Sequence, residues 1–160
     1  MILVAVGTFV HGFDALVEAA DEAVAALGAA GFAQIGHGRY LPRRMRWARF
    51  LPAEAFRARL REARIVVCHG GIGIIGEAMR AGRPIVAVPR RGSTTRRHPA
   101  NDQTAFLARL GERFPITVCA DPANLKAALG RCGALGPQHY ALGSDVPELV
   151  ARYLAGSTVR

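Results

Sequence analysis

The chain has 160 residues, the size of a single domain with its own hydrophobic core. Hydrophobic residues make up 51% of it, which excludes a disordered chain. The formal net charge is +9, with 21 Lys and Arg against 12 Asp and Glu. Such a surplus suits a polyanion or an anionic membrane face, or it reflects an arginine-rich composition without a function. We favour the last for most arginines and expect no nucleic-acid partner, but two basic clusters, at 43–46 and 90–98, stand apart.

Cysteine usage and hydropathy indicate the compartment. The three cysteines, Cys68, Cys119 and Cys132, have neither CxxC nor metal-ligand spacing, which predicts buried reduced thiols in a cytoplasmic protein. No segment approaches the roughly 20 apolar residues that span a bilayer. The apolar start over Met1–Val6 lacks a preceding basic region, so we expect a first strand rather than a signal peptide. The protein should therefore stay in the cytoplasm unless a partner tethers it to a membrane.

Apolar runs and helical stretches alternate from end to end. The first part predicts a strand, a turn, a helix ended by Gly31, and two strands, over Ile2–Val6, Gly7–Gly12, Phe13–Ala29, Phe32–Ile35 and Trp47–Phe50. The middle predicts helix, strand, helix and strand, over Ala53–Glu62, Ile65–Cys68, Ile72–Ala81 and Ile85–Val88. After a polar loop, the remainder predicts helix, strand, helix, loop and a last helix, over Asn101–Leu110, Ile116–Cys119, Pro122–Leu129, 130–143 and roughly Val146–Leu154.

This alternation predicts an α/β fold, a Rossmann-like parallel sheet with helices on both faces. Strands without polar residues, such as Ile65–Cys68, agree because parallel strands are buried on both sides. No linker divides the chain, so we expect one domain over 1–160, with its core over about 1–130 and a C-terminal tail and helix over about 131–160. Ligands in such sheets bind at the carboxyl ends of the strands, here the loops at 7–12, 36–46, 68–73, 89–100 and 119–122.

The most informative of these loops is the glycine-rich segment His69-Gly70-Gly71-Ile72-Gly73, which follows a strand and opens a helix. Glycines let a phosphate approach the main chain, and the start of the helix offers free N–H groups with a partial positive charge. Glu77 follows at roughly 7 Å along the helix axis. Its carboxylate could accept hydrogen bonds from the two hydroxyls of a ribose whose diphosphate lies at the helix start.

Two other interpretations of this loop remain open. Gly71, Gly73 and Gly76 also match the GxGxxG pattern of dinucleotide-binding folds, and Arg90 and Arg91 follow where an arginine could take the 2′-phosphate of NADP. The loop lies in mid-chain, whereas this pattern usually opens its domain. The remaining possibility is a glycine-rich turn that only packs a helix on a strand.

Further motifs make a resemblance specific. They are Gly7-Thr8, Gln34-Ile35-Gly36, Phe50-Leu51-Pro52, Gly82-Arg83-Pro84, Pro89, and Asn101-Asp102-Gln103. In this order, with the glycine loop and Glu77, they resemble the C-terminal domain of family 28 glycosyltransferases of the GT-B fold over roughly residues 2–125. The chain is most similar to single-domain subunits of two-part glycosyltransferases. These are the bacterial PssE-type exopolysaccharide subunits and the cytosolic subunit of the UDP-N-acetylglucosamine transferase of lipid-linked oligosaccharide synthesis.

The resemblance implies roles for individual residues. Glu77 resembles the ribose-binding glutamate. The amides of Gly71, Ile72 and Gly73, with His69 nearby, resemble the diphosphate cradle, and Gly7, Thr8 and Gly70 are further expected substrate contacts. Asn101, Asp102 and Gln103 match contacts to sugar hydroxyls, and helix capping is the alternative for the first two. Arg90 and His98 lie in the basic loop beside this predicted sugar site. The family usually has Ser or Thr where Ile74 stands here, so phosphate binding must rely on main-chain amides or on another hydroxyl such as that of Thr8.

The catalytic base is unknown at this level. His11 in the first loop and His98 are the candidates, while His139 has nothing near it in sequence to support a role. A lone histidine is more often a surface or packing residue, and no pair has zinc-ligand spacing.

The resemblance further implies what the chain does and with whom. It implies an inverting, metal-independent hexosyltransferase that needs no cofactor, since no DxD-like acidic pair suggests a bound metal, and that uses a UDP-sugar donor. A GT-B enzyme needs two such domains, so we expect a membrane-anchored second subunit that binds a lipid-linked or polysaccharide acceptor and holds this chain at the inner face of the membrane. The alternatives are an NADP-binding oxidoreductase module and a non-catalytic nucleotide-binding regulator.

Overall fold

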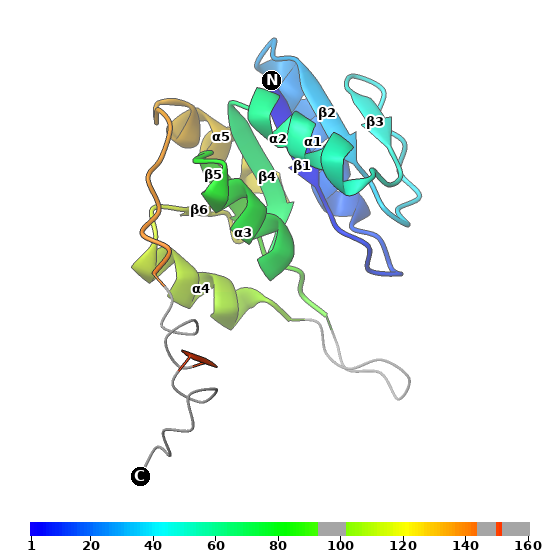
Figure 1. The fold of residues 1–160 in the computed structure, drawn as a ribbon. Helices are drawn as coiled ribbons and strands as arrows, with labels where there is room; N and C mark the ends of the chain where they lie inside the picture. Colours follow the sequence, from blue (N-terminus) through cyan, green and yellow to red (C-terminus); the bar gives the residue numbers. More distant parts are fainter. Residues whose placement is uncertain (93–101, 144–149, 152–160) are drawn as a thin grey trace.

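In the computed structural model, residues 1–92, 102–143 and 150–151 are described. They form one parallel sheet of six strands in the order β3-β2-β1-β4-β5-β6 (Figure 1). The strands are β1 (Ile2–Ala5), β2 (Gly31–Gln34), β3 (Arg46–Ala48), β4 (Ile65–His69), β5 (Ile85–Val88) and β6 (Thr117–Val118). Every residue of β1, β4 and β5 is buried, as expected for central strands covered on both faces.

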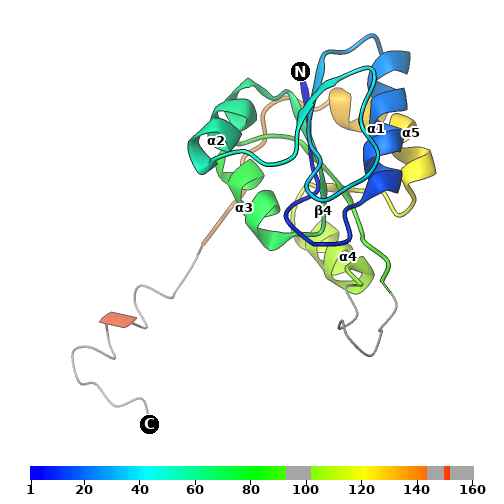
Figure 2. The ribbon, with the colours of Figure 1, turned by 90° about the vertical axis from the view of Figure 1, so that its right-hand side faces the viewer.

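Helices cover both faces of this sheet. On one face lie α1 (Asp14–Ala26), the short 3₁₀ turn η1 (Pro122–Asn124) and α5 (Leu125–Gly133), and on the other lie α2 (Ala53–Glu62), α3 (Ile72–Arg80) and α4 (Thr104–Arg113). Figure 2 shows α1 and α5 on the opposite side of the sheet from α2 and α3. Alternate strand residues serve the two layers, since Val4 and Val67 pack toward α1 and α5 whereas Leu3 and Val66 pack toward α2 and α3. The predicted α/β fold class is confirmed.

Several element bounds differ from those expected. Helix α1 ends at Ala26 because Gly28 takes a left-handed conformation (φ +59°), and Gly31 begins β2 instead of ending the helix. Strand β3 covers Arg46–Ala48 rather than Trp47–Phe50, because it follows the register of β2 and not the apolar residues. The fourth helix begins at Thr104, three residues later than expected.

More of the C-terminal part packs into the core than the sequence predicted. Helix α5 runs to Gly133, four residues beyond the expected end at Leu129. In the segment expected as a loop, Tyr140 is 6% exposed, packs into the α2–α3–α4 layer and donates from its hydroxyl to the carbonyl of Arg83 at 2.8 Å. The last expected helix, near 146–154, lies almost wholly outside the described residues.

Two carboxylates of α1 fix the crossover from β2 to β3. Asp21 is 1% exposed and accepts hydrogen bonds from the main-chain amides of Arg43 and Arg44, at 2.8 and 2.9 Å, and from the hydroxyl of Tyr40 at 3.0 Å. Asp14 accepts in the same way from the amides of residues 39 and 40. These bonds satisfy main-chain N–H groups that have no partner in a neighbouring strand. The loop that carries Arg43 and Arg44 is therefore fixed through its backbone.

The strand order places the ligand-binding end. The chain proceeds outward from β1 to β2 and β3, then returns to β4 on the other side of β1 and proceeds to β5 and β6. Ala5 at the end of β1 pairs with Cys68 near the end of β4, so the loops that follow these two strands lie together. Open sheets of this order bind ligands in the crevice at the carboxyl ends where the direction reverses.

Candidate functional site

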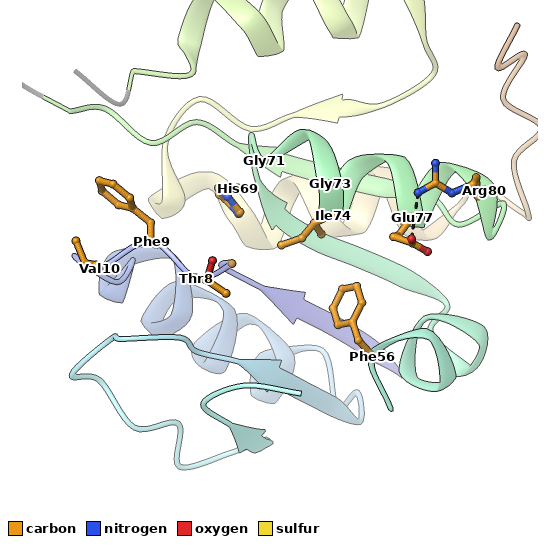
Figure 3. A pocket seen from close by; sticks show the side chains of 11 residues that line it. Thr8, Phe9, Val10, Phe56, His69, Gly71, Gly73, Ile74, Glu77 and Arg80 are labelled. Atoms are coloured by element: carbon orange, nitrogen blue, oxygen red, sulfur yellow. Dashed lines mark hydrogen bonds and ion pairs between the residues drawn. The ribbon is translucent and has the colours of Figure 1, made fainter. Parts of the chain in front are cut away.

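A cavity of about 750 Å³ lies at this point of the sheet (Figure 3). Its walls come from the loop after β1, the glycine loop after β4, and helices α2 and α3. The lining residues are Gly7, Thr8, Phe9, Val10, Phe56, His69, Gly71, Gly73, Ile74, Glu77 and Arg80. The cavity therefore brings together six residues that the sequence predicts as ligand contacts, Gly7, Thr8, His69, Gly71, Gly73 and Glu77.

Gly7 and the glycines of the loop after β4 are glycines for different physical reasons. A Cβ at Gly71 would lie 2.4 Å from Nε2 of His69, and one at Gly7 would lie 2.7 Å from Cε1 of the same ring. A Cβ at Gly70 would lie 2.8 Å from the side chain of Gln103. Gly73 differs, because a Cβ there would meet nothing within 4 Å. Three glycines thus make room for neighbouring groups, and the fourth lies beside open space in the wall of the cavity.

The imidazole of His69 is held uncharged. Burial lowers its pKa from 6.5 to about 4, the positive charge of Arg90 acts in the same direction, and a hydrogen bond with the main chain of Ala5 opposes them. At neutral pH this histidine is therefore a neutral group between two glycines at the base of the cavity.

Arg90 does not line this cavity, although the sequence places it in the loop beside the predicted sugar site. Its side chain is 7% exposed and donates to the carbonyl oxygens of Val6, at 2.9 Å, and of Gly12. Its guanidinium also lies 5.4 Å from the ring centroid of Phe9 and 4.7 Å from that of Phe13. Burial lowers its pKa from 12.5 to about 10, so it stays charged at neutral pH.

Gln103 connects the glycine loop with the loop after β5. Its side-chain Oε1 accepts from the main-chain amides of Gly70, at 2.9 Å, and Arg90, at 3.1 Å. The main-chain amide of Gln103 donates to the carbonyl of Arg90 at 2.9 Å. The carbonyl of the side chain is thus engaged by the protein itself. The predicted contact with a sugar would therefore have to use another part of the Gln103 side chain. In this structure the residue connects the two loops that shape the site.

Glu77 projects into the far end of the cavity, beside Arg80 (Figure 3). Its carboxylate lies 3.1 Å from a guanidinium nitrogen of Arg80 and 3.6 Å from one of Arg57, which comes from α2. The Glu77 side chain remains 30% exposed, so its carboxylate is oriented by two cations and still accessible from the cavity.

The other predicted residues are more scattered. Ile72 is 67% exposed on the first turn of α3, and Ile74 lines the cavity where the family usually has a hydroxyl. Asp102 accepts from the amide of Thr104 at 2.8 Å, which lowers its pKa, while the N-cap position of α4 is occupied by Gln103. His11 is exposed with its ring edge-on to that of Phe9. His98 and Asn101 lie outside the described residues.

Five residues of the site were not predicted. Three of them line the cavity, namely Phe9, Val10 and Phe56. The other two, Arg57 and Arg80, form ion pairs with Glu77. Arg80 could have been found, because it follows Glu77 by three residues on one helix face. Gln34 supports the site from β2, since its side-chain amide exchanges hydrogen bonds of 3.3 and 3.2 Å with the main chain of Gly7.

The dinucleotide interpretation does not fit the position of its last glycine. In that fingerprint the third glycine allows the helix to pack closely on a strand. A Cβ at Gly76 would meet only the side chain of Arg80, at 3.6 Å or more. The spacing of Gly71, Gly73 and Gly76 is therefore present without its packing reason.

Within residues 1–92, 102–143 and 150–151, no three His, Cys, Asp or Glu side chains gather as a metal site would require. The same residues contain no helix of the length and hydropathy that crossing a membrane demands.

An open parallel sheet with a cavity at the reversal of strand order, beside a helix opened by glycines, defines an α/β domain with a Rossmann-like fold. The chain belongs to the glycosyltransferase family 28 C-terminal domain, which its sequence matches over residues 1–142. This family assignment favours the glycosyltransferase over the oxidoreductase interpretation.

Solved structures agree in fold. The calicheamicin glycosyltransferase CalG4 superposes with a TM-score of 0.63 at 23% identity, over 98% of this chain and 37% of CalG4. Glycosyltransferase VinC in complex with dTDP gives 0.55 at 23%, over 83% and 33%, and MurG from Acinetobacter baumannii gives 0.55 at 20%, over 80% and 40%. The chain spans less than half the length of each. No curated protein matches the sequence.

Proposed function

We propose that the chain is the donor-binding catalytic subunit of an inverting, metal-independent glycosyltransferase that uses a UDP-sugar. In this proposal a second, membrane-anchored subunit binds a lipid-linked or polysaccharide acceptor and holds the chain at the cytoplasmic face of the membrane. The observation that carries the proposal is the cavity beside the loops that follow β1 and β4, with the start of α3 at one end and the partly exposed carboxylate of Glu77 at the other.

The diphosphate belongs at the start of α3 in this proposal. The main-chain amides of Ile72 and Gly73 lie in the first turn of the nine-residue helix α3, where N–H groups have no partner within the helix, whereas the amide of Gly71 donates to the carbonyl of His69 at 2.8 Å. The positive end of the helix dipole favours an anion there. The open space beside Gly73 lets a phosphate approach the main chain, and the exposed hydroxyl of Thr8 faces it from the loop after β1. The dTDP bound by VinC is a ligand of the same chemical class, on a protein of the same fold.

The nucleoside then extends along α3. Glu77 is about one and a half turns into the helix, so a ribose attached to the diphosphate reaches its carboxylate. The two arginines that pair with Glu77 orient its side chain, and a carboxylate accepts from both hydroxyls of a ribose.

Transfer would proceed by attack of an acceptor hydroxyl on the anomeric carbon while the bond to the UDP oxygen breaks. The negative charge that develops on the diphosphate is stabilised by the amides at the start of α3. Among the described residues that line the cavity, His69 is buried and uncharged and Glu77 is paired with arginines. The proposal assigns the base that takes the proton of the acceptor hydroxyl to the second subunit, with His11 and His98 as the alternatives within this chain.

Isothermal titration of UDP into the purified chain tests the donor site, with divalent ions removed by EDTA. We expect binding by the wild type and its loss in Glu77→Ala, whereas Glu112→Ala, an exposed glutamate of α4, leaves it unchanged. Equal UDP affinity in Glu77→Ala and wild type would refute the ribose assignment, and tighter binding of NADPH than of UDP would favour the oxidoreductase module.

Transfer is tested separately by co-purification with a candidate second subunit, followed by a screen of UDP-sugars. A chain that binds UDP but supports no transfer in the reconstituted pair would be a nucleotide-binding regulator rather than a catalytic subunit.

A further inference from the structure

Arg90 is a buried cation without a matching anion. No carboxylate of the described residues forms an ion pair with it, and its Nε has no hydrogen-bond partner there. Burying a guanidinium is costly unless its charge meets well-placed acceptors. Packing alone does not explain why a buried cation lies at this end of the sheet.

The partners of Arg90 all belong to one loop. Its guanidinium bridges the carbonyl oxygen of Val6, where β1 has ended, and that of Gly12, just before α1. These two carbonyls bracket the loop over 7–12, which supplies Gly7, Thr8, Phe9 and Val10 to the cavity. The ring of Phe9 itself lies against the guanidinium.

The other end of Arg90 is fixed to the glycine loop. Its main-chain amide and that of Gly70 share one acceptor, Oε1 of Gln103. Arg90 thus connects the two loops that form opposite walls of the cavity, although it contributes no atom to the cavity surface. Residues distant in sequence, such as 6 and 90, are joined at the carboxyl end of the sheet in this way.

We propose that Arg90 is a positioning residue, whose guanidinium holds the 7–12 loop in the conformation that completes the donor cavity. This inference rests on the proposed donor-binding function of the same cavity. An arginine suits the role because its planar fork donates in two directions at once, toward two carbonyls, whereas a lysine offers one compact charge.

Three variants separate the contributions of shape and charge. Arg90→Lys keeps the charge but loses the fork, Arg90→Met removes both, and Arg109→Met removes an exposed arginine of α4 as the matched control. For each folded variant, UDP affinity is measured by titration, the amide resonances of residues 7–12 by NMR, and the pKa of His69 from its ring protons.

We expect Arg90→Lys to bind UDP about tenfold more weakly than wild type, the loss of roughly one charge-assisted hydrogen bond, with shifted amide resonances in the 7–12 loop. The pKa of His69 should stay near its wild-type value of about 4 in this variant and rise in Arg90→Met, because only the second removes the nearby positive charge. Arg109→Met should match wild type in all three measurements.

Wild-type UDP affinity with unchanged amide resonances in folded Arg90→Lys would overturn the inference, and this variant decides the matter if Arg90→Met fails to fold. A pKa of His69 that stays unchanged in folded Arg90→Met would likewise count against the inference, because the guanidinium would then not lie where the inference places it. A wild-type chain that binds no UDP would instead refute the proposed function, so the two failures are distinct.

Discussion

The buried imidazole of His69 makes the stability of the fold depend on pH over a definite range. The pKa of His69 is about 4 in the folded chain, against 6.5 for an ordinary histidine. Between these values the unfolded chain binds a proton at this position that the folded chain excludes, so stability rises with pH there. The contribution is fully present above about pH 6.5 and is lost as the pH falls toward 4. From about pH 7 to about pH 4.5 the loss integrates to about 2.5 kcal/mol.

Urea unfolding of wild type and His69→Gln at both pH values measures this term. Acidic residues that lose stability at low pH contribute equally to both proteins, so the difference between their pH dependences isolates His69. We expect wild type to lose about 2.5 kcal/mol more than His69→Gln, whereas His37→Gln, an exposed histidine, follows wild type. Parallel curves for wild type and His69→Gln would show that the ring is not held uncharged, and the geometry between the two glycines would need another explanation.

Two further predictions concern stability and are read by the same unfolding assay. Gly71→Ala should destabilise the chain by about 1–3 kcal/mol, because its Cβ would lie 2.4 Å from the ring of His69. Gly73→Ala should instead stabilise α3 by about 0.5–1 kcal/mol, because its Cβ would meet nothing within 4 Å. Gly73→Ala should also weaken UDP binding, and a variant that is neither more stable nor weaker in binding contradicts the exposed position of this glycine. Asp21→Asn should cost about 2–3 kcal/mol and speed hydrogen exchange in the loop it holds, since an amide cannot accept all its bonds, with Glu22→Gln as the exposed control.

The fold followed from the sequence where burial is complete. Strands β4 and β5 were predicted almost to the residue, because strands covered on both faces consist mainly of apolar residues. Strand β3 was misplaced, since it lies at the edge of the sheet with Arg46 and Trp47 exposed. Its position is set by the amides of Ile35 and Gly36, which pair with the carbonyls of residues 48 and 49, and an apolar pattern carries no trace of such bonds.

The site was predictable in its main chain and less so in its side chains. The position of the glycine loop and of Glu77 followed from a strand, a turn and a helix in succession. The arginine that reaches Glu77 from α2 did not, because Arg57 lies twenty residues earlier and the packing of α2 against α3 decides the contact. Arg90 was assigned to the ligand by its place in the sequence, but its side chain turns inward to main-chain carbonyls that no residue pattern reveals.

The charges around the cavity support the proposal that a second subunit supplies the catalytic base. Binding a nucleoside diphosphate needs amides, cations and a hydroxyl acceptor, and the cavity has all three in the start of α3, in Arg80 and in Glu77. Deprotonating an acceptor needs a free base, and here the imidazole of His69 lies in a buried space with a pKa near 4. We therefore expect the isolated chain to bind UDP without transferring sugar to an acceptor. Transfer by the isolated chain, measured as release of UDP that depends on added acceptor, would place the base within this chain and remove the need for a second subunit in catalysis.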